Sequence, residues 1–251
     1  MSRSGAWAAA LTGGLIFGLG GLPWAALLLV FFISSSALSR AFARRKREVS
    51  EKFSKGSRRD WAQVLANGGL GGLLVIAHGV FPEQTWPWIA YCGAMAAVNA
   101  DTWATELGVL SRGMPRLITT GRLVERGASG GISLLGTAAS LAGAMLIGFT
   151  ATVFPFGSAP LILPGPASLL VAASLGGLLG SLFDSFLGAT VQAIYRCPNC
   201  GKETERHPFH TCGSQTRLVR GWRWLDNDVV NFACSLAGAA TAVGVWRLVV
   251  G

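Results

Sequence analysis

Residues 86–110 read WPWIAYCGAMAAVNADTWATELGVL, which is long enough to cross a bilayer as one helix. A spanning helix needs about 20 mostly apolar residues. Three strongly polar residues interrupt this run, namely Asn99, Asp101 and Glu106. Because a carboxylate at the centre of a bilayer costs roughly 2.5–3.5 kcal/mol, such residues within a span indicate function. The stretch therefore predicts a membrane helix that contributes to a functional site.

Six other apolar stretches of comparable length flank this one along the chain. They are 5–21, 22–42, 61–81, 130–154, 167–195 and 229–250. The 251 residues are 51% hydrophobic and only 13% charged, whereas a soluble domain carries roughly 25% charged residues. These features predict a single all-α membrane domain over residues 1–251, a polytopic bundle of about seven transmembrane helices. They imply membrane lipids as partners, and they exclude a disordered tail and a nucleic-acid-binding domain.

The basic residues are unevenly distributed along the chain. There are 21 Lys and Arg residues against 12 Asp and Glu residues, and the formal net charge is +9. All of the basic residues except Arg3 and Arg247 fall in three loops, which cover 40–59, 112–126 and 196–223. By the positive-inside rule these loops are cytoplasmic. The prediction is an integral protein of the cell (inner) membrane, with its N-terminus outside and its site facing the cytoplasm.

Acidic and amide residues recur in or beside four of the predicted spans. They are Asp60, Asn67, Asn99, Asp101, Glu106, Asp184, Asp226, Asp228 and Asn231. Clustered hard oxygen ligands suit Mg²⁺, which is bound through one or two carboxylates together with phosphate oxygens and water. Hydrogen bonding between helices is the structural alternative, and an ion or proton pathway is the competing functional one.

Two of the basic loops carry groups suited to binding phosphate. Lys52, Lys55 and Arg58 lie just before Asp60, although much of the basic run before them can serve as a stop-transfer signal. Arg116 and Arg122 lie in the second loop, which ends in Ser129-Gly130-Gly131 at a predicted helix start. Free backbone N–H groups at such a start favour an anion.

The third basic loop contains four soft metal ligands within CPNCGKETERHPFHTCG (197–213). Cys197, Cys200, His210 and Cys212 fit a tetrahedral zinc site, with His207 as an alternative ligand. Disulfides are uncommon in the cytoplasm, which favours a metal, with free thiols or a redox pair as the alternatives. The prediction is a structural Zn²⁺ knuckle in a cytoplasmic insertion, 196–224.

Several long motifs resemble those of the polytopic membrane family that contains the plant phytyl-phosphate kinases. They are RRDWAQVLANGG (58–69), NADTWATELG (99–108), PRLITTGRLVERGASGGISLLGT (115–137), GSLFDSFLGATVQ (180–192) and LDNDVVNF (225–232). The resemblance covers about residues 34–250 in the same motif order. It implies Mg²⁺-dependent phosphoryl transfer from a nucleoside triphosphate, CTP in the plant enzymes, to a prenyl monophosphate such as phytyl or geranylgeranyl phosphate.

That reaction gives the candidate residues their roles. Asp101, Glu106 and Asp184 are expected to organise Mg²⁺ and phosphates, with Asp60 orienting a lysine or completing the metal site and Asp226 and Asp228 as further ligands. The expected phosphate-binding residues are Lys52, Lys55, Arg58, Arg116, Arg122, Ser129, Gly130 and Gly131. The expected nucleotide or supporting contacts are Asn67, Asn99, Gln192, Asn227 and Asn231.

Two other activities fit the same residues. One is a cytidylyltransferase that forms a CDP-lipid and releases pyrophosphate, and the other is a transporter of a phosphorylated lipid. Because other family members lack the cysteine-rich loop, the resemblance implies that this loop is dispensable for the chemistry. Close helix approach at the GxxxG pairs within the spans can serve contacts within one chain or in a homo-oligomer.

Overall fold

The computed structural model describes residues 1–42, 59–154 and 165–250 of the chain. Its described part is mostly helical, with six α-helices and five short strands. In chain order they are α1 (Arg3–Ala41), α2 (Trp61–Val80), α3 (Trp86–Gly108), β1 (Arg116–Leu117), β2 (Gly131–Ile132), α4 (Leu134–Val153), α5 (Pro166–Thr190), β3 (Ile194–Arg196), β4 (Glu203–Thr204), β5 (Arg217–Arg220) and α6 (Asn227–Val250).

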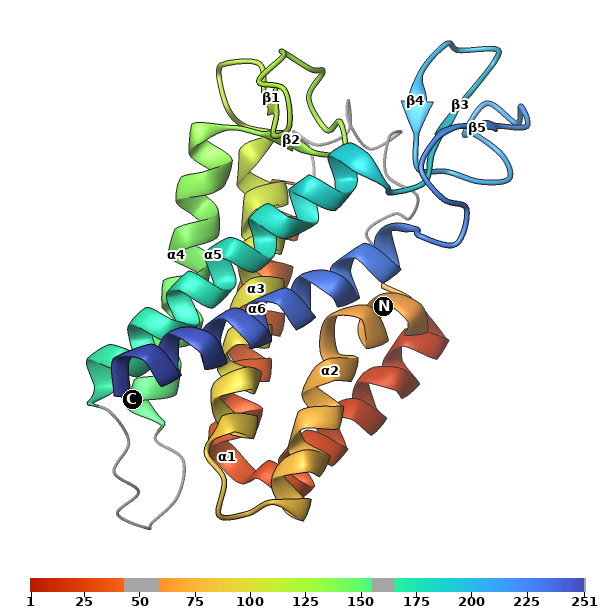
Figure 1. The fold of residues 1–251 in the computed structure, drawn as a ribbon. Helices are drawn as coiled ribbons and strands as arrows, with labels where there is room; N and C mark the ends of the chain where they lie inside the picture. The colour runs from red at the N-terminus through yellow and green to blue at the C-terminus, as the bar shows by residue number, and fades with distance from the viewer. Residues whose placement is uncertain (43–58, 155–164, 251) are drawn as a thin grey trace.

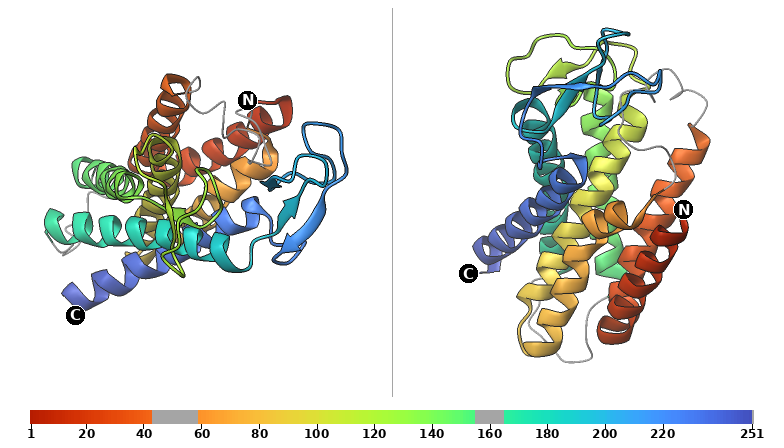
Figure 2. Two further views of the ribbon diagram at one scale, coloured as in Figure 1. Left: turned by 90° about the horizontal axis from the view of Figure 1, so that it is seen from above. Right: turned by 90° about the vertical axis from the view of Figure 1, so that its right-hand side faces the viewer.

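The first helix is bent into two legs at Gly21. This residue has φ 69° and ψ −160°, a conformation that glycine adopts without steric cost. Serines of the second leg bond to α3, where Ser34 reaches Asn99 and Ser39 reaches Glu106. The second leg thus runs alongside α3 in the same direction (Figure 2). The break falls where the sequence places the boundary between its first two spans.

The polar helix α3 is the centre of the bundle. It contacts α1, α2, α4, α5 and α6, and the view from above in Figure 2 shows it surrounded by them. Its residues from Pro87 to Ala100 are buried. Close approach elsewhere in the core depends on small residues, since a Cβ at Gly176 of α5 would meet the backbone oxygen of Gly238 in α6.

Five of the described helices are long and apolar enough to cross a membrane: α1, α2, α4, α5 and α6. The polar α3 is not among them. These lengths and compositions support an integral membrane helical bundle, as predicted. The count of seven spans stays a prediction, because it requires both legs of α1 and the polar α3 to cross as well.

Two predicted spans have different bounds from the helices in the structure. The helix predicted over 130–154 begins at Leu134, where the Ser133 side chain accepts a hydrogen bond from the Gly136 N–H. The helix predicted over 167–195 ends at Thr190, and β3 follows it. An all-α description is therefore incomplete. One two-stranded antiparallel sheet joins β1 and β2, and one three-stranded antiparallel sheet has the order β4-β3-β5.

Both sheets lie at one end of the bundle, where α3 and α5 end and α4 and α6 begin (Figure 1). The N-terminus lies at the start of α2, because the Ser2 N–H donates to the backbone oxygen of Arg59 at 3.0 Å. The prediction that the N-terminus and the basic loops face opposite sides is wrong. The two legs of α1 return the chain to the end at which it began.

Candidate functional site

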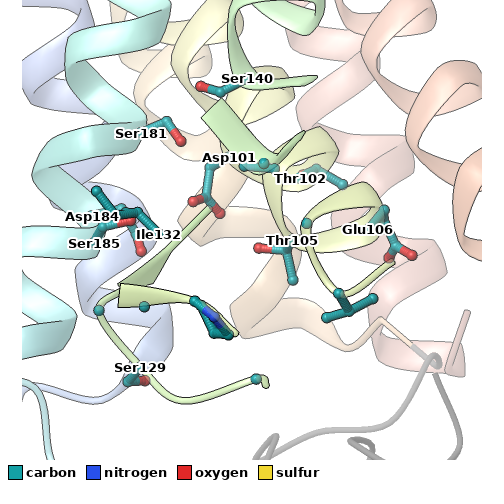
Figure 3. A pocket seen from close by; sticks show the side chains of 18 of the residues that line it. Asp101, Thr102, Thr105, Glu106, Ser129, Ile132, Ser140, Ser181, Asp184 and Ser185 are labelled. Atoms are coloured by element: carbon teal, nitrogen blue, oxygen red, sulfur yellow. The ribbon is translucent and has the colours of Figure 1, made fainter. Parts of the chain in front are cut away.

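A cavity of about 270 Å³ opens at the end of the bundle that carries the two sheets. Residues of α2, α3, α4, α5 and α6 line it, together with the loops before α4 and after α5. Figure 3 shows the carboxylates and hydroxyls that project into it from facing helices. Its charged lining residues are Arg59, Asp101, Glu106, Arg126, Asp184 and Glu205.

Asp101 of α3 and Asp184 of α5 form the acidic centre of this pocket. Their carboxylates and that of Glu205 lie close enough to interact electrostatically. Ser140 and Ser181 lie beside them (Figure 3). The Oδ2 atom of Asp184 and the Oγ atom of Ser140 are buried without a hydrogen-bond partner in the described part of the chain. Buried polar atoms normally have partners, so these two are suited to a ligand.

Glu205 is a pocket residue that the sequence did not indicate. It follows β4 in the cysteine-rich insertion, far along the sequence from α3. Its Oε1 atom accepts hydrogen bonds from Ser129 Oγ and Gln192 Nε2, both at 2.9 Å. The insertion therefore adds a third carboxylate beside Asp101 and Asp184. A carboxylate in a charged loop gives no sequence signal that distinguishes it from a solvated residue.

Glu106 lies on the α1 side of the pocket and is 7% exposed. Its Oε1 atom accepts a 2.7 Å hydrogen bond from Ser39 Oγ. Arg59, just before α2, packs its guanidinium over Phe31 at 5.5 Å from the ring centroid. Burial lowers the pKa of Arg59, and the charge of Glu106 opposes this shift. An arginine stays protonated at such a site, so Arg59 adds a fixed positive charge to the pocket lining.

Ten of the predicted site residues line the pocket. They are Asn67, Asp101, Glu106, Ser129, Gly130, Gly131, Asp184, Gln192, Asn227 and Asn231. Arg126, which contributes to the predicted basic loop, lines it too and donates from Nη2 to the backbone oxygen of Arg112 at 3.1 Å. The Ser129–Gly131 segment contacts the end of α5 and precedes the start of α4 by three residues, so it is not itself the first turn of that helix.

Other predicted residues have structural contacts outside the pocket lining. Asp60 caps α2 in a capping box with Gln63. Asn99 is fully buried and donates from Nδ2 to the backbone oxygen of Gly143 at 2.8 Å. Asp226 Oδ1 accepts the N–H groups of the first turn of α6 at 3.0 and 3.1 Å. Helix capping and helix–helix contact account for these three positions.

Three further predicted residues in the described part of the chain are not brought to the pocket. Arg116 Nη1 donates to the backbone oxygen of Gly121, and Arg122 is exposed in the same loop. Asp228 lies in the first turn of α6 without lining the cavity. Lys52, Lys55 and Arg58 lie outside the described residues, so their phosphate-binding roles stay predictions.

The predicted zinc ligands come together in the insertion. One ligand atom from each of Cys197, Cys200, His210 and Cys212 lies within 4.8 Å of the others. The Sγ atoms of Cys197 and Cys212 are 3.5 Å apart, and His210 Nδ1 is 3.3 Å from Cys212 Sγ. These separations suit four ligands about 2.0–2.3 Å from one tetrahedral zinc ion. The cluster can therefore hold a metal, which is consistent with Zn²⁺.

Two observations characterise the ligands of the cluster. Hydrogen bonds from Ser214 and His210 lower the pKa of the Cys212 thiol to about 5, whereas a hydrogen bond with Cys212 raises the pKa of the Cys200 thiol to about 11. Cys212 is therefore the thiol of this pair that favours the thiolate, the form that binds metals. His207 does not belong to the cluster, since its ring stacks on Tyr195 with centroids 4.6 Å apart. His210 is therefore the histidine of the ligand set.

Comparison with known proteins identifies the family of this chain. Residues 1–239 match the family described as Integral membrane protein DUF92, and the chain belongs to that family. This confirms the predicted membership of a polytopic membrane family. No solved structure matches the chain.

Its relatives come from plants and microorganisms. Protein PGR of Arabidopsis thaliana is 35% identical over 232 residues, which cover 86% of this chain and 79% of that protein. An uncharacterized membrane protein of Methanocaldococcus jannaschii is 35% identical over 189 residues, 75% of this chain and 74% of that protein. Protein VTE6, chloroplastic, of Arabidopsis thaliana is 26% identical over 97% of this chain and 64% of its own length.

Proposed function

We propose that the protein catalyses Mg²⁺-dependent phosphoryl transfer from a nucleoside triphosphate, with CTP the expected donor, to a membrane-embedded prenyl monophosphate. The observation that carries the proposal is one pocket lined by the acidic residues Asp101 and Asp184 together with the basic residues Arg59 and Arg126. Carboxylates suit a divalent cation, and guanidinium groups suit phosphate oxygens. The motif resemblance to the phytyl-phosphate kinase family supports the same reaction class.

The pocket offers what phosphoryl transfer needs from a protein. The reaction depends mainly on positioning and charge stabilisation. An oxygen of the prenyl phosphate forms a bond to the γ-phosphorus while the bond from that phosphorus to the bridging β–γ oxygen breaks, and the nucleoside diphosphate leaves. No general base is needed, because the acceptor phosphate is already anionic. Arg59 and Arg126 would bind the phosphate oxygens.

The acidic residues fit a divalent cation. Asp101 and Asp184 would hold it, with Glu205 beside them and Glu106 on the α1 side of the pocket. The buried Oδ2 atom of Asp184, which has no hydrogen-bond partner among the described residues, is a ready ligand. A Mg²⁺ ion held there would supply positive charge that stabilises the negative charge developing during transfer.

The position of the pocket suits a lipid acceptor. It lies at the end of a bundle whose helices are long and apolar enough to span a membrane. A prenyl chain would then lie in the bilayer while its phosphate enters the pocket. The basic loops at the same end favour a cytoplasmic location for this site, and the N-terminus would then be cytoplasmic as well.

Product analysis separates the proposal from its alternatives. Purified protein in detergent is incubated with Mg²⁺, α-labelled CTP and geranylgeranyl phosphate, and the nucleotide products are resolved. We expect labelled CDP together with geranylgeranyl diphosphate. A labelled CDP-lipid with release of pyrophosphate would support a cytidylyltransferase instead. Absence of turnover together with lipid-phosphate exchange across proteoliposomes would support a transporter.

A further inference from the structure

The cysteine-rich insertion reaches the membrane pocket through one side chain, that of Glu205. We propose that the Cys/His insertion is a metal-locked arm, which holds Glu205 beside Asp101 and Asp184 as the third carboxylate of the divalent-cation site. This inference rests on the proposed function, in which the pocket binds a divalent cation. It reverses the expectation that the loop is dispensable for the chemistry of this chain.

Glu205 is held in place from the bundle side. Its Oε1 atom accepts 2.9 Å hydrogen bonds from Ser129, in the loop before α4, and from Gln192, just after α5. Gln192 is 2% exposed, so its amide cannot exchange this partner for bulk water. The carboxylate of Glu205 interacts electrostatically with those of Asp101 and Asp184. Three acidic groups from three separate elements therefore converge in one cavity.

The base of the arm is fastened to the end of α5. Arg220 of β5 donates from Nη2 to the Gly188 backbone oxygen at 2.9 Å and from Nη1 to the Ala189 backbone oxygen at 3.2 Å. A cation at the C-terminus of a helix also interacts favourably with the helix dipole. The Trp222 N–H donates to the Val191 backbone oxygen at 3.0 Å. The arm thus has a fixed point of attachment close to Gln192.

The metal cluster joins the two segments of the arm that flank Glu205 in the sequence. Cys197 and Cys200 precede Glu205 in sequence, and His210 and Cys212 follow it. The three strands of this small sheet, of which β4 lies between the ligands, contain only two to four residues each, and such short strands are marginally stable by themselves. A structural zinc site supplies folding free energy directly. A bound metal would therefore fix the segment that carries Glu205.

Glu205 contributes negative charge to the cation site. Three neighbouring carboxylates repel one another without a cation, and a divalent ion between them removes that repulsion. Loss of one carboxylate weakens the binding of such an ion. Loss of the zinc cluster should have the same effect, because it releases the arm that positions Glu205. Zinc occupancy of the arm would then set the cation affinity of the membrane pocket.

Mn²⁺ titration of detergent-purified holo-protein, followed by the electron paramagnetic resonance signal of free Mn²⁺, tests this coupling. We expect Glu205→Gln to weaken Mn²⁺ binding by roughly 10-fold to 100-fold. Glu203→Gln is the matched control. Glu203 lies two residues earlier, is exposed, and pairs with Arg196 at 3.0 Å, so its substitution should leave Mn²⁺ affinity unchanged.

A double-variant cycle connects the two metal sites. Cys212→Ser should lose zinc and weaken Mn²⁺ binding about as much as Glu205→Gln does, and the double variant should be no weaker than Glu205→Gln alone. Wild-type affinity in Glu205→Gln, or an undiminished effect of Cys212→Ser in the Glu205→Gln background, would overturn the proposal. Absence of Mn²⁺ binding by the wild type would overturn the cation site of the proposed function as well, which separates the two failures.

Discussion

The side-chain amide of Gln192 donates a 2.9 Å hydrogen bond to Glu205 Oε1, and this contact joins the end of α5 to the cysteine-rich insertion. Gln192 is 2% exposed, and it lines the same pocket as Asp101 and Asp184. Gln192, which is expected from the sequence to be a nucleotide or supporting contact, hydrogen-bonds a carboxylate that comes from another part of the chain. Gln192 thus has a positioning role, and measurements of cation binding by Gln192 variants can test it.

Substituting Gln192 should reduce cation affinity without removing zinc. Gln192→Leu deletes the donor to Glu205 while keeping a side chain of similar volume, and we expect Mn²⁺ affinity to fall by about tenfold, as for other residues that orient metal ligands. Zinc content, measured by atomic emission on the same samples, should stay at the wild-type value. Unchanged Mn²⁺ affinity would contradict a positioning role for Gln192.

The two central aspartates should be needed for turnover. Asp101→Asn and Asp184→Asn each remove a charge from the acidic centre, and we expect Mg²⁺-dependent kcat/KM to fall by roughly 100-fold or more, as when a preorganised electrostatic group is lost. Asp226→Asn is the control. Asp226 caps α6 outside the pocket lining, and asparagine caps a helix about as well as aspartate.

Turnover of the Asp226→Asn control shows whether Asp226 caps α6 or binds a metal. Near-wild-type turnover in Asp226→Asn supports a capping role. A loss comparable to that of Asp184→Asn would restore Asp226 as a candidate metal ligand.

Two arginines should differ in their effect on phosphate binding. Arg59 lines the pocket, whereas Arg116 bonds to Gly121 in its own loop. We expect Arg59→Ala to raise the KM for the nucleotide or the lipid phosphate by about tenfold, the loss of one charge-assisted hydrogen bond. Arg116→Ala should leave both KM values unchanged. Equal effects of the two substitutions would mean that long-range charge, and not contact in the pocket, attracts the phosphates.

Asp60 should affect stability more than chemistry. Its side chain accepts the N–H of Gln63 at 3.0 Å, and the Gln63 side chain accepts the Asp60 N–H at 3.2 Å. Asp60→Ala removes this capping box and should cost about 1 kcal/mol of stability, seen as a lower midpoint of thermal unfolding in detergent. Asp60→Asn keeps the cap, so we expect it to retain turnover. Inactive but stable Asp60→Asn protein would show that the carboxylate itself takes part in the reaction.

Much of the bundle follows from local properties of the sequence. Long apolar runs predict the helices, and the positive φ of Gly21 lies where the Gly-Gly-Leu-Pro sequence indicates a boundary. Asp101, Glu106 and Asp184 were predictable, because a carboxylate within an apolar helix is costly enough to need a purpose. The spacing of Cys197, Cys200, His210 and Cys212 likewise predicts their convergence.

The rest depends on tertiary contacts that no local pattern encodes. Asn99 lies on the same face of α3 as Glu106, but its amide is satisfied by Gly143 on α4, which only the packing of the two helices reveals. Glu205 reaches the pocket because β4 pairs with β3 and the arm bends back toward α5. The prediction for the side of the N-terminus is wrong for a different reason. Two apolar legs precede the first basic loop, and together they return the chain to the end of the bundle at which it began.

Phosphoryl transfer by this protein would be seen directly as movement of the γ-phosphate of CTP to the lipid. Detergent-purified protein is supplied with Mg²⁺ and geranylgeranyl phosphate, and CTP is labelled with ³²P at the γ-position in one reaction and at the α-position in another. We expect lipid extracts to contain label from γ-labelled CTP as geranylgeranyl diphosphate and none from α-labelled CTP. Label that enters the lipid from the α-position, or no labelled lipid from either donor, would contradict phosphoryl transfer to the prenyl phosphate.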